Sequence, residues 1–277
     1  MFTKIWQEGR LLWAEFSRTN ASTHASSACY FSFLSLVPLL AICISLVTMT
    51  GVSHEQVLGF ISLLVPDALK GFVDTLINDA FERSGLALSL SSLTLFWSAS
   101  KGIKALRGGL NSAYYMEETR NAVLVAIISI VSVLLLGVML AATVYLMFGN
   151  SVLHALASKL PDCKEADALT TMLNWLGTFA LGTFAVNVCY TYLPAGKRPF
   201  VAQLPGAVLA SIGGALFTFG FHIYVDHFSN FTVLYGSIAT VALFLFWMYL
   251  TYYILLIGAF ANLYLASRAK RNQRVRP

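Results

Sequence analysis

Basic side chains gather behind one apolar stretch of this sequence, in a pattern suited to holding a negatively charged group. Four side chains recur at three- or four-residue spacing: Lys101, Lys104, Arg107 and Asn111. On a helix they share one broad face, and a cationic face at headgroup depth suits the phosphate of an anionic lipid or an anionic substrate. The alternative is that these cations only fix the orientation of a membrane helix and bind no ligand.

A polar stripe leads into this basic face. Ser91, Thr94 and Ser98 lie at i, i+3 and i+7, directly before Lys101. Small hydroxyl side chains in an apolar helix commonly form hydrogen bonds to a neighbouring helix. The functional alternative is that the stripe forms the wall of a hydrophilic path through the membrane.

A third polar group follows another apolar stretch. His222 and Asp226 are one helical turn apart and His227 is adjacent, which is the raw material for a proton relay or a weak metal site. Histidine and aspartate near a membrane boundary are also ordinary capping groups. A metal would need further ligands from elsewhere, so we predict no metal and no cofactor. The sequence contains no GxSxG, HExxH, Walker or GxGxxG motif, and we expect neither an enzyme, including a ribonuclease, nor a nucleic-acid binder.

Long apolar stretches must position these groups. The 277 residues are 57% hydrophobic and 11% charged, against about 25% charged in soluble proteins. Six stretches lack Asp, Glu, Lys and Arg, and each is long enough to cross a membrane as a helix. The sequence therefore predicts an all-α membrane protein with spans near 26–50, 85–104, 122–148, 171–193, 203–225 and 237–266.

Shorter segments complete the predicted single membrane domain, 1–277. Residues 1–18 have one apolar face and are expected to lie as a helix on the inner membrane surface. Residues 67–82 are predicted to form an amphipathic helix outside. It either lies on the outer leaflet or caps the bundle, or it acts as a lid over an exit path. The second span is expected to continue as a helix through 101–120, and 268–277 form a basic tail.

The distribution of charge predicts the topology. Fourteen of the 18 Lys and Arg residues fall on the side that holds both termini. Cytoplasmic segments carry this excess in membrane proteins, so both termini are expected in the cytoplasm. The basic balance of the chain is thus a topology signal.

Several small residues and one proline indicate helix packing. Gly206, Ala210 and Gly214 repeat at i, i+4 and i+8, which allows a neighbouring backbone to approach closely. Pro38 falls inside the first span and is expected to kink it unless neighbours compensate. Gly236 precedes the predicted final helix.

Five segments together resemble a known family. They read SACYFSFLSLVPLL (27–40), FWSASKGIKALRGGLNSAYYMEETR (96–120), YTYLP (190–194), QLPGAVLAS (203–211) and NFTVLYGSIATVALFLFWMYL (230–250). The chain is similar to the YihY/BrkB family, once labelled ribonuclease BN. The resemblance implies a bacterial inner-membrane protein with six helices and cytoplasmic ends, and suggests export of a lipid or other amphiphile.

One position departs from this resemblance. Relatives commonly carry an acidic residue after the Gly-Ala of the last span, where this chain has Phe260. If that acid couples transport or binds substrate, this protein must use Asn262 or another group, or must lack the mechanism.

Two functions remain open from the sequence. The leading hypothesis is a transporter, exporter or flippase for an anionic amphiphile, with membrane lipids as its partners. The alternative is a non-transporting scaffold that maintains the envelope and recruits partners through its basic surfaces. The substrate, the energy coupling and the oligomeric state are left open.

Overall fold

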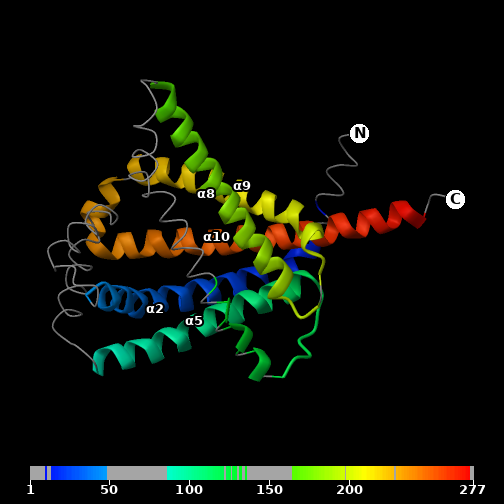
Figure 1. Cartoon of the computed structure of the whole chain (residues 1–277), viewed down its shortest axis with the longest axis horizontal. Coiled ribbons are helices and arrows are strands. Elements are labelled where there is room, and N and C mark those ends of the chain that lie inside the picture. The colour runs from blue at the N-terminus through cyan, green and yellow to red at the C-terminus, as the bar shows by residue number, and fades with distance from the viewer. Residues whose placement is uncertain are drawn as a thin grey trace. The chain divides into compact units, whose positions relative to one another are not determined.

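The described part of the chain is helical. The computed structural model describes residues 10, 14–48, 86–121, 123–125, 127–129, 131, 132, 135, 164–196, 198–227 and 229–274. Its helices are α2 (Ala21–Thr48), α5 (Leu86–Ala113), α8 (Lys164–Tyr192), α9 (Phe200–His227) and α10 (Ser229–Arg274), labelled in Figure 1. No strand occurs in these ranges, which confirms the predicted helical class for them.

Two stretches of the described residues have the length and apolar character needed to cross a membrane: Phe200–Val225 in α9 and Val241–Arg268 in α10. The predicted amphipathic segment 67–82 and most of the predicted span 122–148 lie outside the described residues.

The final helix begins earlier than the sequence predicted. α10 starts at Ser229 rather than near 237 and runs through Gly236. Ser and Asn are favoured at helix N-termini because their side chains accept hydrogen bonds from unpaired backbone amides. Ser229 and Asn230 therefore suit the first turn of this helix better than a preceding loop.

The chain divides into two compact units. Unit 1 comprises Met1–Ala21, Arg107–Leu216 and Tyr253–Pro277, and unit 2 comprises Ser22–Leu106 and Phe217–Tyr252. Helices α5, α9 and α10 each contribute residues to both units.

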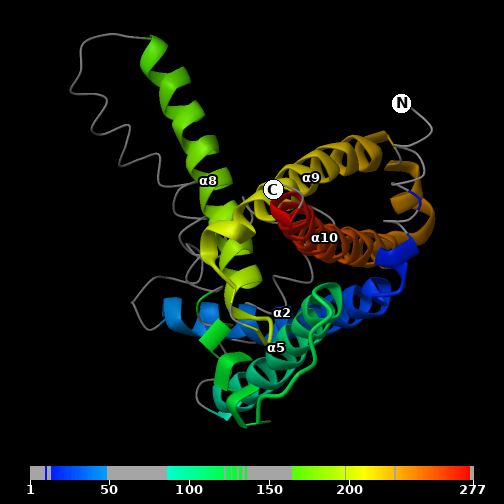
Figure 2. The same ribbon diagram turned by 90° about the vertical axis from the view of Figure 1, so that its right-hand side faces the viewer.

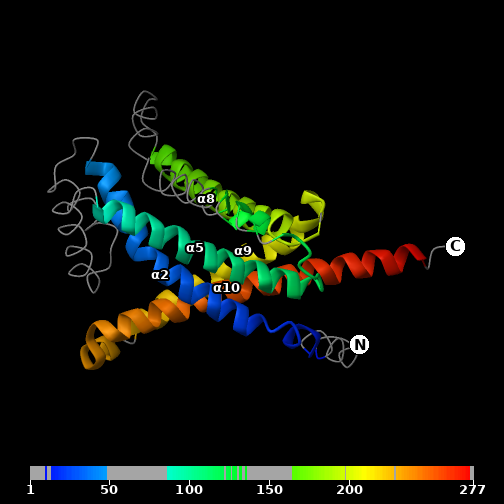
Figure 3. The same cartoon turned by 90° about the horizontal axis from the view of Figure 1, so that it is seen from below.

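In unit 2, α2 packs against α5 and α10. The rings of Phe31 and Trp97 meet edge to face with their centroids 6.2 Å apart, a favourable geometry for aromatic pairs. A Cβ added at Gly102 would lie 3.2 Å from Ser32 Oγ, so α2 and α5 run side by side, as Figures 1 and 3 show. On α10, the Tyr252 hydroxyl lies 2.7 Å from Ser32 Oγ.

In unit 1, α9 and α10 approach closely. A Cβ added at Gly258 would lie 2.7 Å from both the Ala210 Cβ and the Gly206 carbonyl oxygen. The two helices lie side by side in Figure 2. Phe16, from the predicted interfacial helix 1–18, is buried against the rings of Tyr253 and Phe260. Phe260 thus fills the apolar core of this unit.

Candidate functional site

The site is built where α5 ends. Tyr115 has a positive φ of 53°, the left-handed conformation that commonly closes a helix. The Met116 amide donates to the Asn111 carbonyl (2.8 Å) and the Tyr115 amide to the Ser112 carbonyl (3.1 Å), the paired bonds of a Schellman motif. The helix predicted over 101–120 is therefore wrong beyond Ala113, because the chain reverses at Tyr115 and brings Glu118 back over α5.

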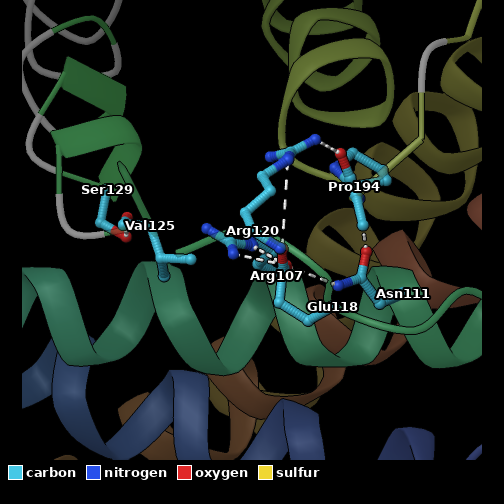
Figure 4. Close-up of polar contacts among 8 residues, drawn as sticks. Arg107, Asn111, Glu118, Arg120, Val125, Ser129 and Pro194 are labelled. Carbon is cyan, nitrogen blue, oxygen red and sulfur yellow. Dashed lines mark hydrogen bonds and ion pairs between the residues drawn. The ribbon is translucent and has the colours of Figure 1, made fainter. Parts of the chain in front are cut away.

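Glu118 receives hydrogen bonds from three residues around it. Arg107 Nε donates to Glu118 Oε2 (2.7 Å), and Arg107 Nη2 forms an ion pair with the same oxygen. Asn111 Nδ2 also donates to Oε2 (3.1 Å), while the backbone amide of Arg120 donates to Oε1 (3.2 Å). Figure 4 shows Glu118 between these groups above α5. We call Arg107, Asn111 and Arg120 the cradle.

The cradle also holds the connection between α8 and α9. Asn111 Oδ1 accepts from the Ala195 amide (2.8 Å), and Arg120 Nη2 donates to the Pro194 carbonyl. The carboxylate of Glu118 and the loop at Pro194 therefore contact the same two residues, Asn111 and Arg120 (Figure 4).

The cradle is only partly neutralised. Arg107 is 2% exposed and Asn111 is 6% exposed, so the Arg107 guanidinium is shielded from water. Arg120 Nε lies 4.0 Å from Glu118 Oε1, so the carboxylate faces both guanidinium groups. Two buried guanidinium nitrogens, Arg107 Nη1 and Arg120 Nη1, have no hydrogen-bond partner among the described residues. Buried polar atoms of proteins are nearly always hydrogen-bonded, so these two nitrogens are available to donate to a further oxygen ligand.

The ionisation of Glu118 reflects these contacts. Desolvation raises the pKa of Glu118, but the hydrogen bonds from Arg107, the Arg120 amide and Asn111 outweigh it, and the net pKa is lowered from its ordinary 4.5. The side chain is 30% exposed, so the carboxylate can be reached from outside while the Arg107 side chain, at 3%, cannot.

A second set of contacts adjoins the cradle in sequence. The Tyr114 hydroxyl donates to Gln203 Oε1 (2.8 Å), and the Arg198 guanidinium stacks 3.6 Å from the centre of the Tyr114 ring. Burial raises the pKa of Tyr114 to about 12, partly offset by Asn262 and Arg198, so the hydroxyl stays protonated and able to donate. Arg198 Nε is a further buried nitrogen to which the described residues offer no acceptor.

Asn262 joins α10 to α9 beside Pro205. Its Oδ1 accepts from the Gly206 amide (2.7 Å) and its Nδ2 donates to the Gln203 carbonyl (2.9 Å). Proline lacks an amide hydrogen and disturbs the hydrogen bonding of the helix around it. Asn262, 3% exposed, adds a side-chain bridge to backbone groups on either side of Pro205. Asn262 was the residue considered as a substitute for the acid that is absent at Phe260. Its side chain instead takes part in helix packing.

The structure divides the predicted basic face. Arg107 and Asn111 lie together in unit 1, whereas Lys101 and Lys104 belong to unit 2 and are exposed. Lys101 Nζ lies 5.8 Å from the centre of the Trp97 ring, on its own helix. Of the four predicted side chains, Arg107 and Asn111 are therefore the ones that gather around the Glu118 carboxylate.

The other predicted polar groups are placed as follows. Ser98 is buried and its hydroxyl donates to the Thr94 carbonyl (2.7 Å), one turn back on α5, while the Thr94 side chain is exposed. The Ser91 side chain lies outside the described residues. His222 is exposed, and the side chains of Asp226 and His227 lie outside the described residues.

The packing residues differ along α9. Gly206 and Ala210 are buried against α10 at Gly258, whereas a Cβ added at Gly214 would meet no described atom within 4 Å. α2 continues as a helix through Pro38. Within the described part of the chain, no group of three or more His, Cys, Asp or Glu side chains is arranged to hold a metal ion.

Four residues of the site were not singled out from the sequence: Tyr114, Glu118, Arg120 and Arg198. Glu118 could have been recognised from its neighbours in the sequence, because the pair Glu117 and Glu118 lies within a strongly basic region. A buried arginine needs an anionic partner, and the nearest carboxylates along the chain are these two.

Comparison with known proteins identifies relatives along nearly the whole chain. A family model described as Virulence factor BrkB matches residues 12–277, which confirms the resemblance found in the sequence. The ribonuclease-like protein YfkH of Bacillus subtilis is 27% identical over 262 residues, covering 94% of this chain and 95% of its own length.

Other relatives are named as membrane proteins. A UPF0761 membrane protein of Rhodospirillum rubrum is 29% identical over 244 residues, or 85% of this chain, which spans only 53% of that protein. A UPF0761 membrane protein of Vibrio vulnificus is 24% identical over 261 residues, covering 90% of this chain and 79% of its own length. No solved structure matches.

Proposed function

Since this chain belongs to the Virulence factor BrkB family of membrane proteins, we propose that it is a transporter that moves an anionic amphiphile, such as a lipid, across a bilayer. Export or flipping from the cytoplasmic side is the proposed direction. The cationic residues at and before the end of α5 are proposed to receive the headgroup.

The proposed topology has six spans with both termini in the cytoplasm. It is supported by the six uncharged stretches of the sequence and by the surplus of Lys and Arg on the side of both termini. The apolar lengths within α9 and α10 agree with two of these spans. In this topology the cradle lies at the cytoplasmic boundary.

The observation that carries the proposal is the buried Arg107. Removing a guanidinium from water costs several kcal/mol unless it is paired, so a buried arginine whose donors are only partly used is a candidate for binding a further anion. Arg107 is 2% exposed, and its Nη1 finds no acceptor among the described residues although the chain provides a carboxylate next to it. Lys101 and Lys104, exposed on the preceding turns of α5, would attract anionic headgroups from the surface.

Native mass spectrometry of protein purified in native lipid tests this function. We expect the wild type to retain an anionic amphiphile, and the variant with Lys101, Lys104 and Arg107 all changed to Gln to lose it. Arg268→Gln is the matched control, because Arg268 is an exposed cation on α10 that lies over the ring of Tyr264. Loss of ligand from the control as well would indicate a general charge effect.

Flux supplies the second measurement. Vesicles containing the wild-type protein should move a fluorescent anionic lipid between leaflets faster than empty vesicles, and the triple variant should not. A retained ligand without any flux would contradict transport and favour the alternative of a membrane scaffold.

A further inference from the structure

We propose that the cradle of Arg107, Asn111 and Arg120 is a phosphate-binding site that Glu118 occupies from within the chain, and that the phosphate group of a ligand displaces Glu118. The inference rests on the proposed function only in taking the ligand to be the headgroup of the transported amphiphile. An inorganic phosphate ion has the same recognition chemistry.

The donors around Glu118 already form an oxyanion site. Three kinds of donor converge on the carboxylate: the Arg107 guanidinium (2.7 Å), the Asn111 amide (3.1 Å) and the Arg120 backbone amide (3.2 Å). Arginine and backbone amides are groups that proteins use to bind phosphate oxygens. A phosphate placed where the carboxylate lies would keep all of these bonds.

Donors that Glu118 leaves unused favour a ligand with more oxygens. Arg107 Nη1 and Arg120 Nη1 are buried and have no partner in the part of the chain that the structure describes, although both guanidinium groups contact the carboxylate. A carboxylate has a planar pair of oxygens, whereas a phosphate group presents its oxygens in a tetrahedral arrangement. In the proposed complex, the additional oxygens accept from these two unused donors.

The charge of the cradle points the same way. Arg107 and Arg120 each carry a positive charge, and Glu118 supplies a single negative charge between them. A phosphate monoester carries about −1.5 to −2 at neutral pH, which matches a pair of guanidinium groups better than one carboxylate does. Exchange of Glu118 for phosphate therefore improves the neutralisation of a buried cation.

The local fold permits the exchange. Glu118 lies on the non-helical segment that follows the Schellman motif of α5, and its side chain is 30% exposed. The carboxylate can turn into water without disturbing a helix, and the site it leaves is open on that side. Arg107, at 3% side-chain exposure, stays fixed on α5 to receive the ligand.

Removal of the internal competitor gives the decisive test. Binding of two probes, inorganic phosphate and water-soluble dihexanoyl phosphatidic acid, is measured by calorimetry on the full-length protein in a zwitterionic detergent. We expect Glu118→Gln to bind at least one probe about tenfold more tightly than wild type, since a charge-assisted competitor has been removed. Glu117→Gln is the matched control, because it makes the same charge change at an adjacent exposed residue.

Loss of the donors should act in the opposite direction. Arg107→Lys keeps the charge but loses the planar fork, and we expect about tenfold weaker binding in the Glu118→Gln background. Should Arg107→Lys unfold, Arg120→Gln replaces it, because its side chain is 19% exposed and tolerates change better. Circular dichroism verifies the fold of each variant.

The two probes separate the sources of phosphate. Tighter binding of inorganic phosphate by Glu118→Gln assigns the site to a free ion, and tighter binding of dihexanoyl phosphatidic acid alone assigns it to a lipid headgroup. The proposal is overturned if neither probe binds either protein, or if Glu117→Gln produces the same gain. Phosphate binding without lipid flux would refute the transporter and leave the site intact, whereas flux with no response to Glu118→Gln would refute the site alone.

Discussion

The two units of the molecule share neutral hydroxyl contacts between helices but differ in the contacts that are added to them. In unit 2, neutral hydroxyls join α2 to α10: Ser22 and Tyr249 (3.0 Å), and Ser32 and Tyr252 (2.7 Å). In unit 1, the Tyr190 hydroxyl likewise donates to the Leu255 carbonyl. Two further contacts are added there: ionised side chains and backbone groups of non-helical segments meet around Glu118, and a buried amide bridges two helices at Asn262. Removing one neutral hydroxyl pair lowers the free energy of unfolding only slightly. Removing a partner of a buried charge or amide lowers it more, because a polar group is then left unsatisfied.

The largest effect is expected from the buried amide in unit 1. Asn262→Leu keeps the branched shape of the side chain but removes the acceptor for the Gly206 amide and the donor to the Gln203 carbonyl. Buried polar groups left unsatisfied cost about 1–3 kcal/mol each, so we expect a loss of about 3 kcal/mol in the free energy of unfolding in detergent. Hydrogen exchange should rise in the first turns of α9 and remain unchanged in α2.

Ser267→Ala serves as the control for this substitution. Its hydroxyl donates to the Tyr264 carbonyl within α10 and is exposed, so a change below about 0.5 kcal/mol is expected. Equal losses in the two variants would contradict the role assigned to Asn262.

The close approach of α9 and α10 should give the next largest effect. A Cβ at Gly206 would collide with the Gly258 carbonyl and the Asn262 side chain, so Gly206→Ala should cost about 2 kcal/mol. A Cβ at Gly214 meets no described atom within 4 Å, and Gly214→Ala should stabilise the helix by about 0.5–1 kcal/mol. Thermal unfolding of both variants measures the difference, and changes of the same sign would contradict this packing.

These two sites also show what the sequence could predict. The small-residue repeat identified Gly206 and Ala210, because close helix contacts need small side chains wherever the partner lies. The same repeat included Gly214, which no described side chain approaches. A helical repeat specifies a face, but how far the partner follows that face depends on the crossing of the two helices.

The anion site could be predicted only in part. Helical spacing placed Arg107 and Asn111 on one face, and both contact Glu118. The reversal at Tyr115 was not predicted because left-handed helix ends are usually glycine, and Gly108 and Gly109 lie inside α5 instead. Because the reversal was not predicted, the pairing of Glu118 with Arg107 was not predicted either. The six-span topology and the proposed path stay predictions.

A smaller effect is expected in unit 2. Tyr252→Phe removes the hydroxyl that lies 2.7 Å from Ser32 Oγ and keeps the ring. Hydrogen bonds between membrane helices average about 0.6 kcal/mol, so the free energy of unfolding should fall by about 0.5–1 kcal/mol. A loss as large as that of Asn262→Leu would show that the two units are equally sensitive and would contradict the comparison.

The smallest effect is expected in the pH dependence of stability. It distinguishes the ionised contact at Glu118 in unit 1 from the neutral hydroxyl pair in unit 2. The folded state lowers the pKa of Glu118 below its ordinary 4.5, so the stability that the carboxylate contributes is present above about pH 4.5 and is lost as the pH falls through the lowered value. Protonated Glu118 resembles glutamine. Glu118→Gln should therefore be less stable than wild type at pH 7, with the difference narrowing below about pH 4.5.

Thermal unfolding between about pH 7 and pH 3.5 measures this difference for each variant. Tyr252→Phe is the matched comparison, because it removes a neutral hydroxyl in unit 2 rather than a charge, and its difference from wild type should stay constant. If the Glu118→Gln difference also stays constant, the ionised carboxylate contributes nothing to the cradle. If the difference narrows only for Glu118→Gln, unit 1 depends on charge at the position where an external phosphate would compete.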